Sequence, residues 1–274
     1  MKPHPFIFLF ILLTAFIARC QEKDKTDTTL IKQNVSYLRS YWIDTKGVLT
    51  APVHWNAGKY IAASAVIVGT AALITQDVQI QKFFKRNETT FIDKTSFYFF
   101  SPLGTGFYSI PALGIFYGCG LIWKKDKAKE TALNGLKSYV ITAVFTQILK
   151  QVTHRHRPYQ TDPSDPLIWD GPFSLNILHN SFPSGHSSAI FSIATVIAYE
   201  YHQTVWVPIV CYTVAGFTAL YRLAVNDHWA SDVLFGSALG YAIGSLVYHH
   251  RANKTFEIVP VSSSGIGAAL VFHL

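Results

Sequence analysis

The sequence predicts an all-α fold in the form of a six-helix membrane bundle. Two observations support this prediction, the composition of the chain and the number of its apolar segments. Half of the 274 residues are hydrophobic and only 14% are charged, whereas about a quarter of the residues in soluble globular domains are charged. Six apolar segments each approach the roughly 20 residues that cross a bilayer. They lie at about 59–76, 97–123, 130–150, 186–203, 204–222 and 231–250. A water-soluble bundle of buried helices is the alternative that this moderate hydropathy leaves open.

The N-terminal residues 1–20 have the pattern of a secretory signal peptide. Lys2 precedes an apolar run over residues 6–17, and cleavage before Gln21 puts small residues at both required positions. A lipoprotein acylated at Cys20 and an uncleaved anchor are the alternatives. Residues 21–58 form a polar N-terminal segment without strong periodicity, and residues 59–250 form the helical bundle domain.

Two of the later segments have features of their own. The segment at 130–150 carries Asn134 and Lys137 and is the least apolar of the six. The last segment carries Gly236, Gly240 and Gly244 at a four-residue spacing, which predicts a small-residue stripe for close helix packing.

Two regions are not predicted to span the membrane. The loop at 159–182 is rich in proline and aspartate and long enough to form a lid or rim over a site. In the C-terminal tail, 251–274, apolar residues alternate after a Ser-Gly turn, so a short β-hairpin and a frayed tail are both open.

Three short clusters carry the chemistry of the chain. Consecutive spans end alternately on the two faces of a bundle, so the ends of the third, fourth, fifth and sixth segments place all three clusters on one face. The clusters are Lys150 with Arg157-Pro158, then Pro183-Ser184-Gly185-His186, then Arg222 with His228 and Asp232.

The opposite face carries its own basic residues. Lys124, Lys125, Lys127 and Lys129 lie between the second and third segments, and Arg251 and Lys254 follow the sixth. The positive-inside rule makes that face cytoplasmic, which predicts a bacterial inner-membrane protein with its site toward the periplasm. One conflict stands: a signal peptide delivers residues 21–58 outside, whereas counting back through the segments places them inside.

The cations of the clusters suit a phosphate group. Arginine binds two phosphate oxygens with its planar fork, and lysine supplies a mobile point charge. Lys150, Arg157 and Arg222 are therefore candidate phosphate ligands. The net charge of +7 does not indicate nucleic-acid binding, because the excess lies in loop clusters and in these motifs.

The second and third clusters add reactive groups. Ser184 can cap the helix that follows, and Gly185 lets backbone N–H groups approach an anion. His186 lies in the first turn, where it can protonate a leaving oxygen. His228 and Asp232 are four residues apart and share one helix face. A carboxylate on one ring nitrogen fixes the tautomer and frees the other nitrogen as a nucleophile.

Together, in this order and spacing, the three clusters resemble the signature of the type 2 phosphatidic acid phosphatase and haloperoxidase superfamily, over roughly residues 59–250. The resemblance implies a helical bundle and metal-independent hydrolysis through a phosphohistidine. It implies His228 as nucleophile, Asp232 as its orienting partner and His186 as general acid. Lys150, Arg157, Ser184, Gly185 and Arg222 match the phosphate-binding set.

The chain departs from the family pattern at one position. Tyr221 stands where serine usually precedes the arginine of the third cluster, and this puts the fine phosphate geometry in doubt. His154 and His156 lie outside the matched pattern and are expected to be loop or helix-end residues, and His179 and Asn180 are expected at the rim of the site. Their spacing is unlike a usual zinc set, and a ring of arginine and lysine repels cations, so no metal or other cofactor is expected.

The leading hypothesis is a membrane phosphatase that hydrolyses lipid phosphate or diphosphate esters, such as phosphatidate-like lipids, prenyl diphosphates or lipid-linked sugar phosphates. The alternatives are a soluble secreted acid phosphatase, a vanadium haloperoxidase, and a non-catalytic binding protein with a degenerate site. The sequence does not specify the substrate or the oligomeric state.

Overall fold

The computed structural model describes residues 33–88, 100–176, 178–252, 256–261 and 267–272, and the predicted signal peptide lies outside them. The helices are α2 (Gln33–Thr50), the 3-10 helix η2 (Ala51–His54), α3 (Ala57–Arg86), α5 (Ser101–Gly104), α6 (Ser109–Ile122), α7 (Asp126–Thr153), α8 (Gly185–Glu200), α9 (Trp206–Ala224) and α10 (Ala230–Ala252). The strands are β1 (Phe256–Val261) and β2 (Gly267–Phe272).

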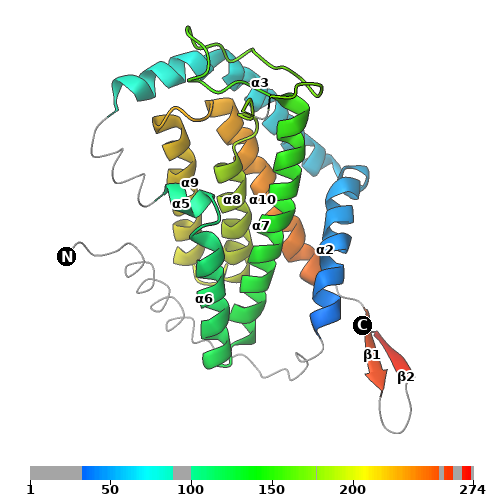
Figure 1. The fold of residues 1–274 in the computed structure, drawn as a ribbon. Coiled ribbons are helices and arrows are strands. Elements are labelled where there is room, and N and C mark those ends of the chain that lie inside the picture. Colours follow the sequence, from blue (N-terminus) through cyan, green and yellow to red (C-terminus); the bar gives the residue numbers. More distant parts are fainter. Residues whose placement is uncertain (1–32, 89–99, 177, 253–255, 262–266, 273–274) are drawn as a thin grey trace, which may run out of the picture.

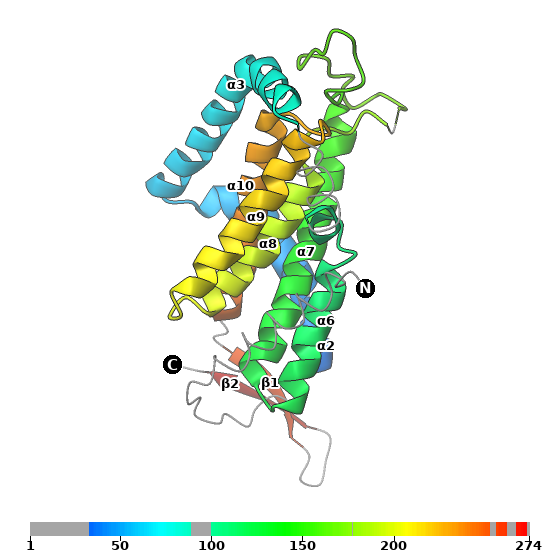
Figure 2. The same ribbon diagram turned by 90° about the vertical axis from the view of Figure 1, so that its left-hand side faces the viewer.

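The predicted helical bundle is confirmed. Helices α6 to α10 run side by side, α3 lies obliquely across one flank, and the β-hairpin projects from the end of α10 (Figures 1 and 2). The hairpin pairs β1 and β2 antiparallel, with Phe256 opposite Phe272, so the tail takes the first of its two predicted forms.

The second predicted segment is two helices rather than one. Pro102 lies in the first turn of α5, and Gly106 takes a positive φ of 81° just after it, so the helix breaks before α6 begins. The 14 residues of α6 span about 21 Å, which is less than the ~30 Å hydrocarbon core. The hydropathy of 97–123 concealed this break because both parts are apolar.

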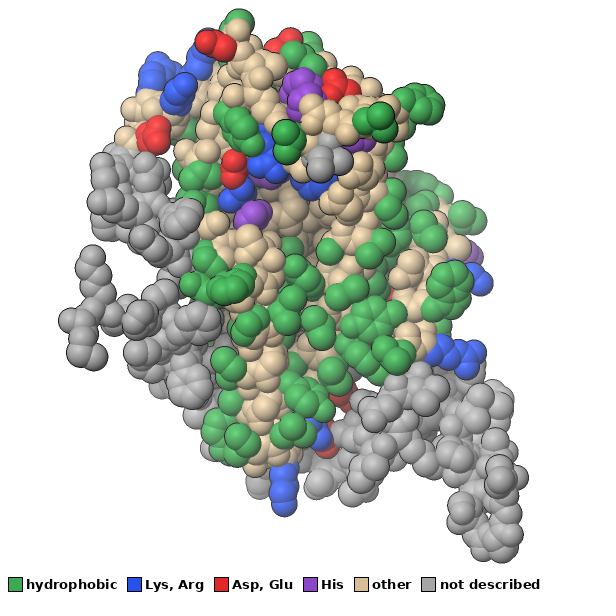
Figure 3. All heavy atoms as spheres, in the orientation of Figure 1, with side chains coloured by type: hydrophobic (Ala, Val, Ile, Leu, Met, Phe, Trp, Pro, Cys, Tyr) green, Lys and Arg blue, Asp and Glu red, His purple; other side chains and the backbone are tan. Residues whose placement is uncertain are grey.

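The outer surface of the bundle is that of a membrane protein. Among the described residues, three helices are long and apolar enough to cross a bilayer: Ala57–Arg86, Trp206–Ala224 and Ala230–His250. Apolar side chains cover the flank of the bundle in Figure 3. The exposed ones recur at helical spacing on α7 (Val140, Val144, Ile148) and α9 (Ile209, Val210, Phe217, Leu220).

Helix α2 was not predicted by the sequence analysis. Its large apolar residues, such as Leu38 and Trp42, face outward, while Asp44 is buried against α7 and α10. Asp44 forms an ion pair with Lys137 at 2.6 Å and contacts His250 at 2.9 Å. The pair explains why α7 tolerates a lysine within an apolar bundle, since a buried charge needs a partner.

The position of α2 bears on the topology conflict. The Tyr37 hydroxyl donates to the carbonyl of Leu133, near the start of α7, at 2.8 Å. Helix α2 therefore begins at the end of the bundle that carries the basic residues Lys124–Lys129, as Figure 1 shows. The start of α2 thus agrees with counting through the segments, but its 18 residues carry the chain away from that end, and the signal peptide stays a prediction.

The glycine stripe of α10 packs directly on α8. A Cβ added at Gly236 would lie 2.6 Å from the carbonyl oxygen of Ser184, and one added at Gly244 would lie 2.5 Å from that of Ser192. Gly240 meets Ser188 in the same way. The missing side chains thus let the two helix backbones touch, and they hold Ser184, at the start of α8, against the first turns of α10.

Candidate active site

The structure brings the three sequence clusters to one end of the bundle. Helices α7 and α9 end there, α8 and α10 begin there, and the loop at 159–182 lies above them (Figure 1). Basic and histidine side chains gather in a hollow at this end (Figure 3). Mutual electrostatic interactions link His186 to Arg222, His228, Lys150 and Arg157, so the predicted residues share one site.

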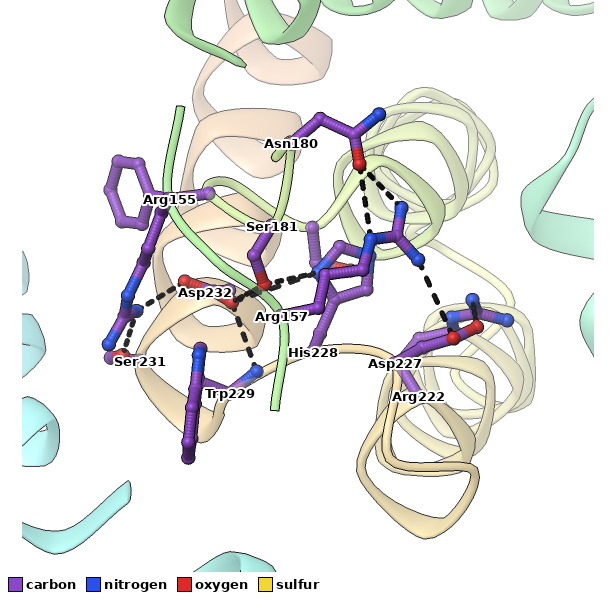
Figure 4. A network of polar contacts seen from close by, with 12 residues as sticks. Arg155, Arg157, Asn180, Ser181, Arg222, Asp227, His228, Trp229, Ser231 and Asp232 are labelled. Atoms are coloured by element: carbon purple, nitrogen blue, oxygen red, sulfur yellow. Dashed lines mark hydrogen bonds and ion pairs between the residues drawn. The ribbon is translucent and has the colours of Figure 1, made fainter. Parts of the chain in front are cut away.

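Asn180 holds the first cluster in place. The ammonium group of Lys150 donates to the backbone carbonyl of Asn180. The guanidinium of Arg157 donates to the side-chain oxygen of the same residue from Nη2 at 2.8 Å and from Nε at 3.1 Å. One residue expected only at the rim therefore fixes two cations of the site. Its backbone holds Lys150, and its side chain holds Arg157 (Figure 4).

Asp227 lies between two arginines. Arg222 forms an ion pair with one oxygen of its carboxylate, and Nη1 of Arg157 lies 3.5 Å from the other. A carboxylate and a phosphate present similar oxygen pairs to guanidinium groups. The carboxylate of Asp227 thus occupies a position that suits an anionic ligand. Sequence analysis did not identify Asp227 because it lies between Arg222 and His228, at a position that the third cluster does not specify.

Ser181 links His228 and Asp232. The direct bond expected between them is absent: Nδ1 of His228 lies 3.7 Å from Asp232. The hydroxyl of Ser181 donates to the Asp232 carboxylate at 2.6 Å and lies 3.5 Å from the same ring nitrogen (Figure 4). The sequence prediction is therefore corrected, because the carboxylate acts on the imidazole over a longer distance and through a shared serine.

His228 lies in the loop between α9 and α10 and is almost completely buried. Burial lowers its pKa well below the ordinary value of 6.5, and the positive charges of Lys150, Arg157 and Arg222 lower it further. A lowered pKa keeps the imidazole neutral at pH 7. A neutral ring has the free lone pair that nucleophilic attack requires.

The second cluster caps α8 as predicted. The hydroxyl of Ser184 accepts from the backbone N–H of Ser187 at 3.5 Å and from its hydroxyl at 2.9 Å. His186 lies in the first turn of α8 and packs against Gly104 of α5, where an added Cβ would lie 2.5 Å from the imidazole. Its Nε2 is buried and has no hydrogen-bond partner among the described residues, so this nitrogen is available to a ligand.

Arg155 is a large, fully buried charged side chain that the sequence analysis missed. It is 0% exposed, as are its partners Asp77, Ser231 and Asp232. Nη2 binds Asp77 at 2.8 Å, while Nη1 binds the Ser231 hydroxyl at 2.8 Å and also the Asp232 carboxylate. Asp77 in turn accepts from the backbone N–H of Ser231 at 3.0 Å. The network ties α3 to the first turn of α10, and so to the residues around His228.

Two tryptophans complete the surroundings of Arg155. Its guanidinium lies 4.7 Å from the ring of Trp169 and 5.6 Å from that of Trp229. The backbone N–H of Trp229 donates to Asp232 at 3.0 Å, and its indole N–H donates to the backbone of His156 at 2.9 Å. Arg155 lies within the first cluster, between Lys150 and Arg157. Sequence analysis gave it no role because only Lys150 and Arg157 match the pattern of the family.

His154 and Tyr221, two further residues that the sequence analysis singled out, make contacts that support the local structure. His154 ends α7 in a left-handed conformation, and its Nδ1 lies 2.9 Å from the carbonyl of Gly171. Tyr221 is buried, with its ring centroid 5.7 Å from the guanidinium carbon of Arg222. Tyrosine at this position therefore packs beside the arginine that it precedes.

Comparison with known proteins identifies related sequences. Residues 132–256 match the family model described as the PAP2 superfamily. A lipid A 1-phosphatase of Porphyromonas gingivalis is 47% identical over 70 residues, which cover 25% of this chain and 16% of that protein. A probable diacylglycerol pyrophosphate phosphatase 1 of Schizosaccharomyces pombe is 27% identical over 179 residues, covering 52% of this chain and 64% of that protein. These alignments thus span less than two thirds of either relative.

A solved structure shares the fold. The crystal structure of the first transmembrane PAP2 type phosphatidylglycerolphosphate phosphatase from Bacillus subtilis matches 80% of this chain and 95% of that chain, with a TM-score of 0.51 and 21% identity. The resemblance that the three clusters predicted is therefore confirmed, and so is the membrane helical fold.

Proposed function

The chain is a member of the PAP2 superfamily through its residues 132–256, and from that premise we propose that it hydrolyses phosphate or diphosphate esters of membrane lipids. The observation that carries the proposal is the meeting of Lys150, Arg157 and Arg222 with two histidines at one end of the bundle. Three cations neutralise the charge that the transferring phosphoryl group spreads over its oxygens.

In the proposed first step, His228 attacks the phosphorus. Ser181 and Asp232 face its Nδ1, so the other ring nitrogen is directed at the substrate. The new N–P bond forms as the bond from phosphorus to the ester oxygen breaks. The negative charge of the bound phosphate favours the protonated form of His186, which then gives its proton to the leaving oxygen. Its Nε2, which is buried and has no hydrogen-bond partner among the described residues, is the atom that supports this role.

In the proposed second step, water attacks the phosphohistidine. His186, now without its proton, takes one from the water, the O–P bond forms and the N–P bond breaks. Phosphate leaves and His228 returns to its neutral form. Ser184 and Gly185 would help to hold the phosphoryl oxygens at the N-terminus of α8, where the helix dipole favours negative charge.

The substrate class is proposed from the setting of the site. The site lies at the end of helices whose outer faces are apolar, where a lipid headgroup would meet the bundle. Relatives named for lipid A and for diacylglycerol pyrophosphate support a lipid phosphate or diphosphate. The same outward-facing apolar side chains disfavour the soluble secreted alternative. We further propose an inner-membrane location with the site toward the periplasm, because Lys124–Lys129 lie at the opposite end.

Phosphate release from a panel of esters tests the function. Purified protein in detergent is given lipid A, phosphatidate, phosphatidylglycerol phosphate, a prenyl diphosphate and p-nitrophenyl phosphate. We expect release from at least one lipid and much slower release from the soluble ester. No release from any member would contradict the proposal, and preference for the soluble ester would revive the soluble acid phosphatase.

Metal removal is expected to leave the turnover number unchanged. The proposed chemistry uses a histidine nucleophile and three cationic side chains, so it requires no metal ion to activate water or to neutralise the phosphate. Lipid phosphatase activity is measured after dialysis against EDTA and again after magnesium is restored. Strict dependence on added magnesium would contradict the proposed mechanism.

The substitution Asp227→Asn is expected to strengthen inhibition by inorganic phosphate. Phosphate must displace the Asp227 carboxylate from Arg157 and Arg222, and removing the charge removes that competition. Because the carboxylate is 29% exposed, the effect corresponds to a surface ion pair of about 0.2–1 kcal/mol, a fall in Ki of up to roughly fivefold. Asp126→Asn, at the opposite end of α7, is the control. Weaker inhibition in Asp227→Asn would show instead that the carboxylate positions the arginines.

A further inference from the structure

A second group of chemically active side chains lies in the loop above the site, outside the proposed machinery. His156 follows the end of α7, His179 precedes Asn180, and Asp170 lies between them in the sequence. Nε2 of His156 lies 3.1 Å from one Asp170 oxygen, and Nδ1 of His179 lies 2.5 Å from the other. The centroids of the two imidazole rings lie 3.5 Å apart, with the ring planes tilted by 36°.

We propose that His156, Asp170 and His179 form a binding site for a borderline divalent transition-metal ion such as Zn²⁺, which braces this loop at the rim of the active site. The three ligand atoms lie within 4.8 Å of one another. Bonds of about 2.0–2.1 Å in a tetrahedral site separate the ligand atoms by about 3.4 Å, so only small movements are needed. The inference does not depend on the proposed function.

The ligand set fits this class of metal. Imidazole nitrogen suits Zn²⁺, Co²⁺ and Ni²⁺, whereas Mg²⁺ and Ca²⁺ prefer oxygen alone. Asp170 supplies a carboxylate oxygen, which Zn²⁺ accepts as a ligand beside imidazole nitrogen. Three protein ligands leave one coordination position for water.

The surroundings can accommodate the ion. The sequence analysis expected cations to exclude a metal, but the Arg157 guanidinium is directed toward Asn180 and Asp227 (Figure 4). Within the part of the chain that the structure describes, Nδ1 of His156 has no hydrogen-bond partner, so that ring can carry its proton there and present Nε2 to the metal. On His179, Nε2 accepts from the side chain of Asn176 at 3.1 Å, so binding moves its proton to Nε2 and turns that amide.

A metal at this position would join the two ends of the loop. His156 and His179 are the immediate neighbours of Arg157 and Asn180, which hydrogen-bond to each other at the site. Between them the loop exposes Phe173 and Leu175, which are 94% and 96% accessible. Fixing both ends and Asp170 restricts the loop without placing the ion among the phosphate ligands.

Metal binding to the full chain tests the proposal directly. Protein without a polyhistidine tag is stripped with EDTA in detergent and titrated calorimetrically with Zn²⁺ alone. We expect the wild type to bind one equivalent more than His156→Ala/His179→Ala. The control His54→Ala/His202→Ala removes two histidines that lie outside the loop and should keep that equivalent. Co²⁺ should give the visible absorption of a tetrahedral site in the wild type and not in the loop variant.

Two further measurements guard against a folding artefact. Asp170→Asn keeps the size of the side chain but removes its charge, and it should weaken Zn²⁺ binding at least about tenfold while the metal-free unfolding temperature stays unchanged. Zn²⁺ should also slow chymotrypsin cleavage at Phe173 and Leu175 in the wild type only. Equal Zn²⁺ stoichiometry and equal cleavage rates in the wild type and the loop variant would overturn the proposal.

Discussion

Replacing His228 with asparagine is expected to abolish phosphate release. Asparagine keeps a polar side chain in the loop before α10 but offers no nucleophilic nitrogen, so the phosphohistidine cannot form. Removing the nucleophile of a covalent mechanism costs on the order of 10⁴–10⁶ in turnover number. The measurement is initial-rate phosphate release from the best lipid of the panel, with enzyme concentrations matched by absorbance.

The control for this prediction is the folded state of the variant. His228 is buried, so its replacement could lower activity through unfolding alone. The unfolding temperature and the gel-filtration profile in detergent should stay close to the wild type, and inorganic phosphate should still bind. A folded His228→Asn enzyme that keeps a tenth of the wild-type rate would contradict the nucleophile assignment.

Replacing Arg155 with methionine is expected to have the largest effect on stability. The substitution leaves the buried carboxylate of Asp77 without its cation, and Asp232 loses one of its donors. Breaking a buried pair by removing one partner costs about 3–5 kcal/mol, which lowers the unfolding temperature by on the order of 10 °C. Thermal unfolding in detergent measures this effect.

The double variant Arg155→Met/Asp77→Asn separates the lost pair from lost packing. Neutralising Asp77 removes the unpaired charge that the single variant buries, so the double variant should be more stable than Arg155→Met alone. Asp232 still has donors in Ser181 and in the backbone of Trp229. A double variant that is less stable than either single variant would show that the two residues act independently.

Much of the site could be predicted from the sequence because its determinants are local. Lys150, Ser184, Arg222 and Asp232 lie at or near helix ends, and the alternation of spans brings four helix ends to one face. The glycine stripe of α10 and the capping by Ser184 were predicted by the same kind of reasoning, and both are observed.

The parts that sequence reasoning missed depend on contacts between distant segments. Arg155 is explained by Asp77, 78 positions away in the chain, and by Ser231 and Asp232, which are almost as far away in the other direction. Ser181 is explained by its contact with the carboxylate of Asp232 in α10. Helix α2 was missed for a different reason: its apolar side chains face outward and its acidic Asp44 faces the bundle. That arrangement is the reverse of a soluble amphipathic helix, and no soluble pattern predicts it.

The His156–Asp170–His179 group was missed for the same reason. Its ligands are separated by 14 and 9 positions, which matches no short metal motif, and only the folded loop brings them together. Spacing alone therefore argued against a metal, whereas the geometry of the loop favours one.

The most direct test of the central claim is to trap the covalent intermediate. Enzyme is mixed with lipid substrate labelled with radioactive phosphate, quenched within the first turnover, and digested under alkaline conditions that preserve phosphohistidine. The label should lie on the peptide that contains His228 and should be absent from His228→Asn. Label on a serine or aspartate peptide, or wild-type turnover by the His228→Asn enzyme, would contradict the account.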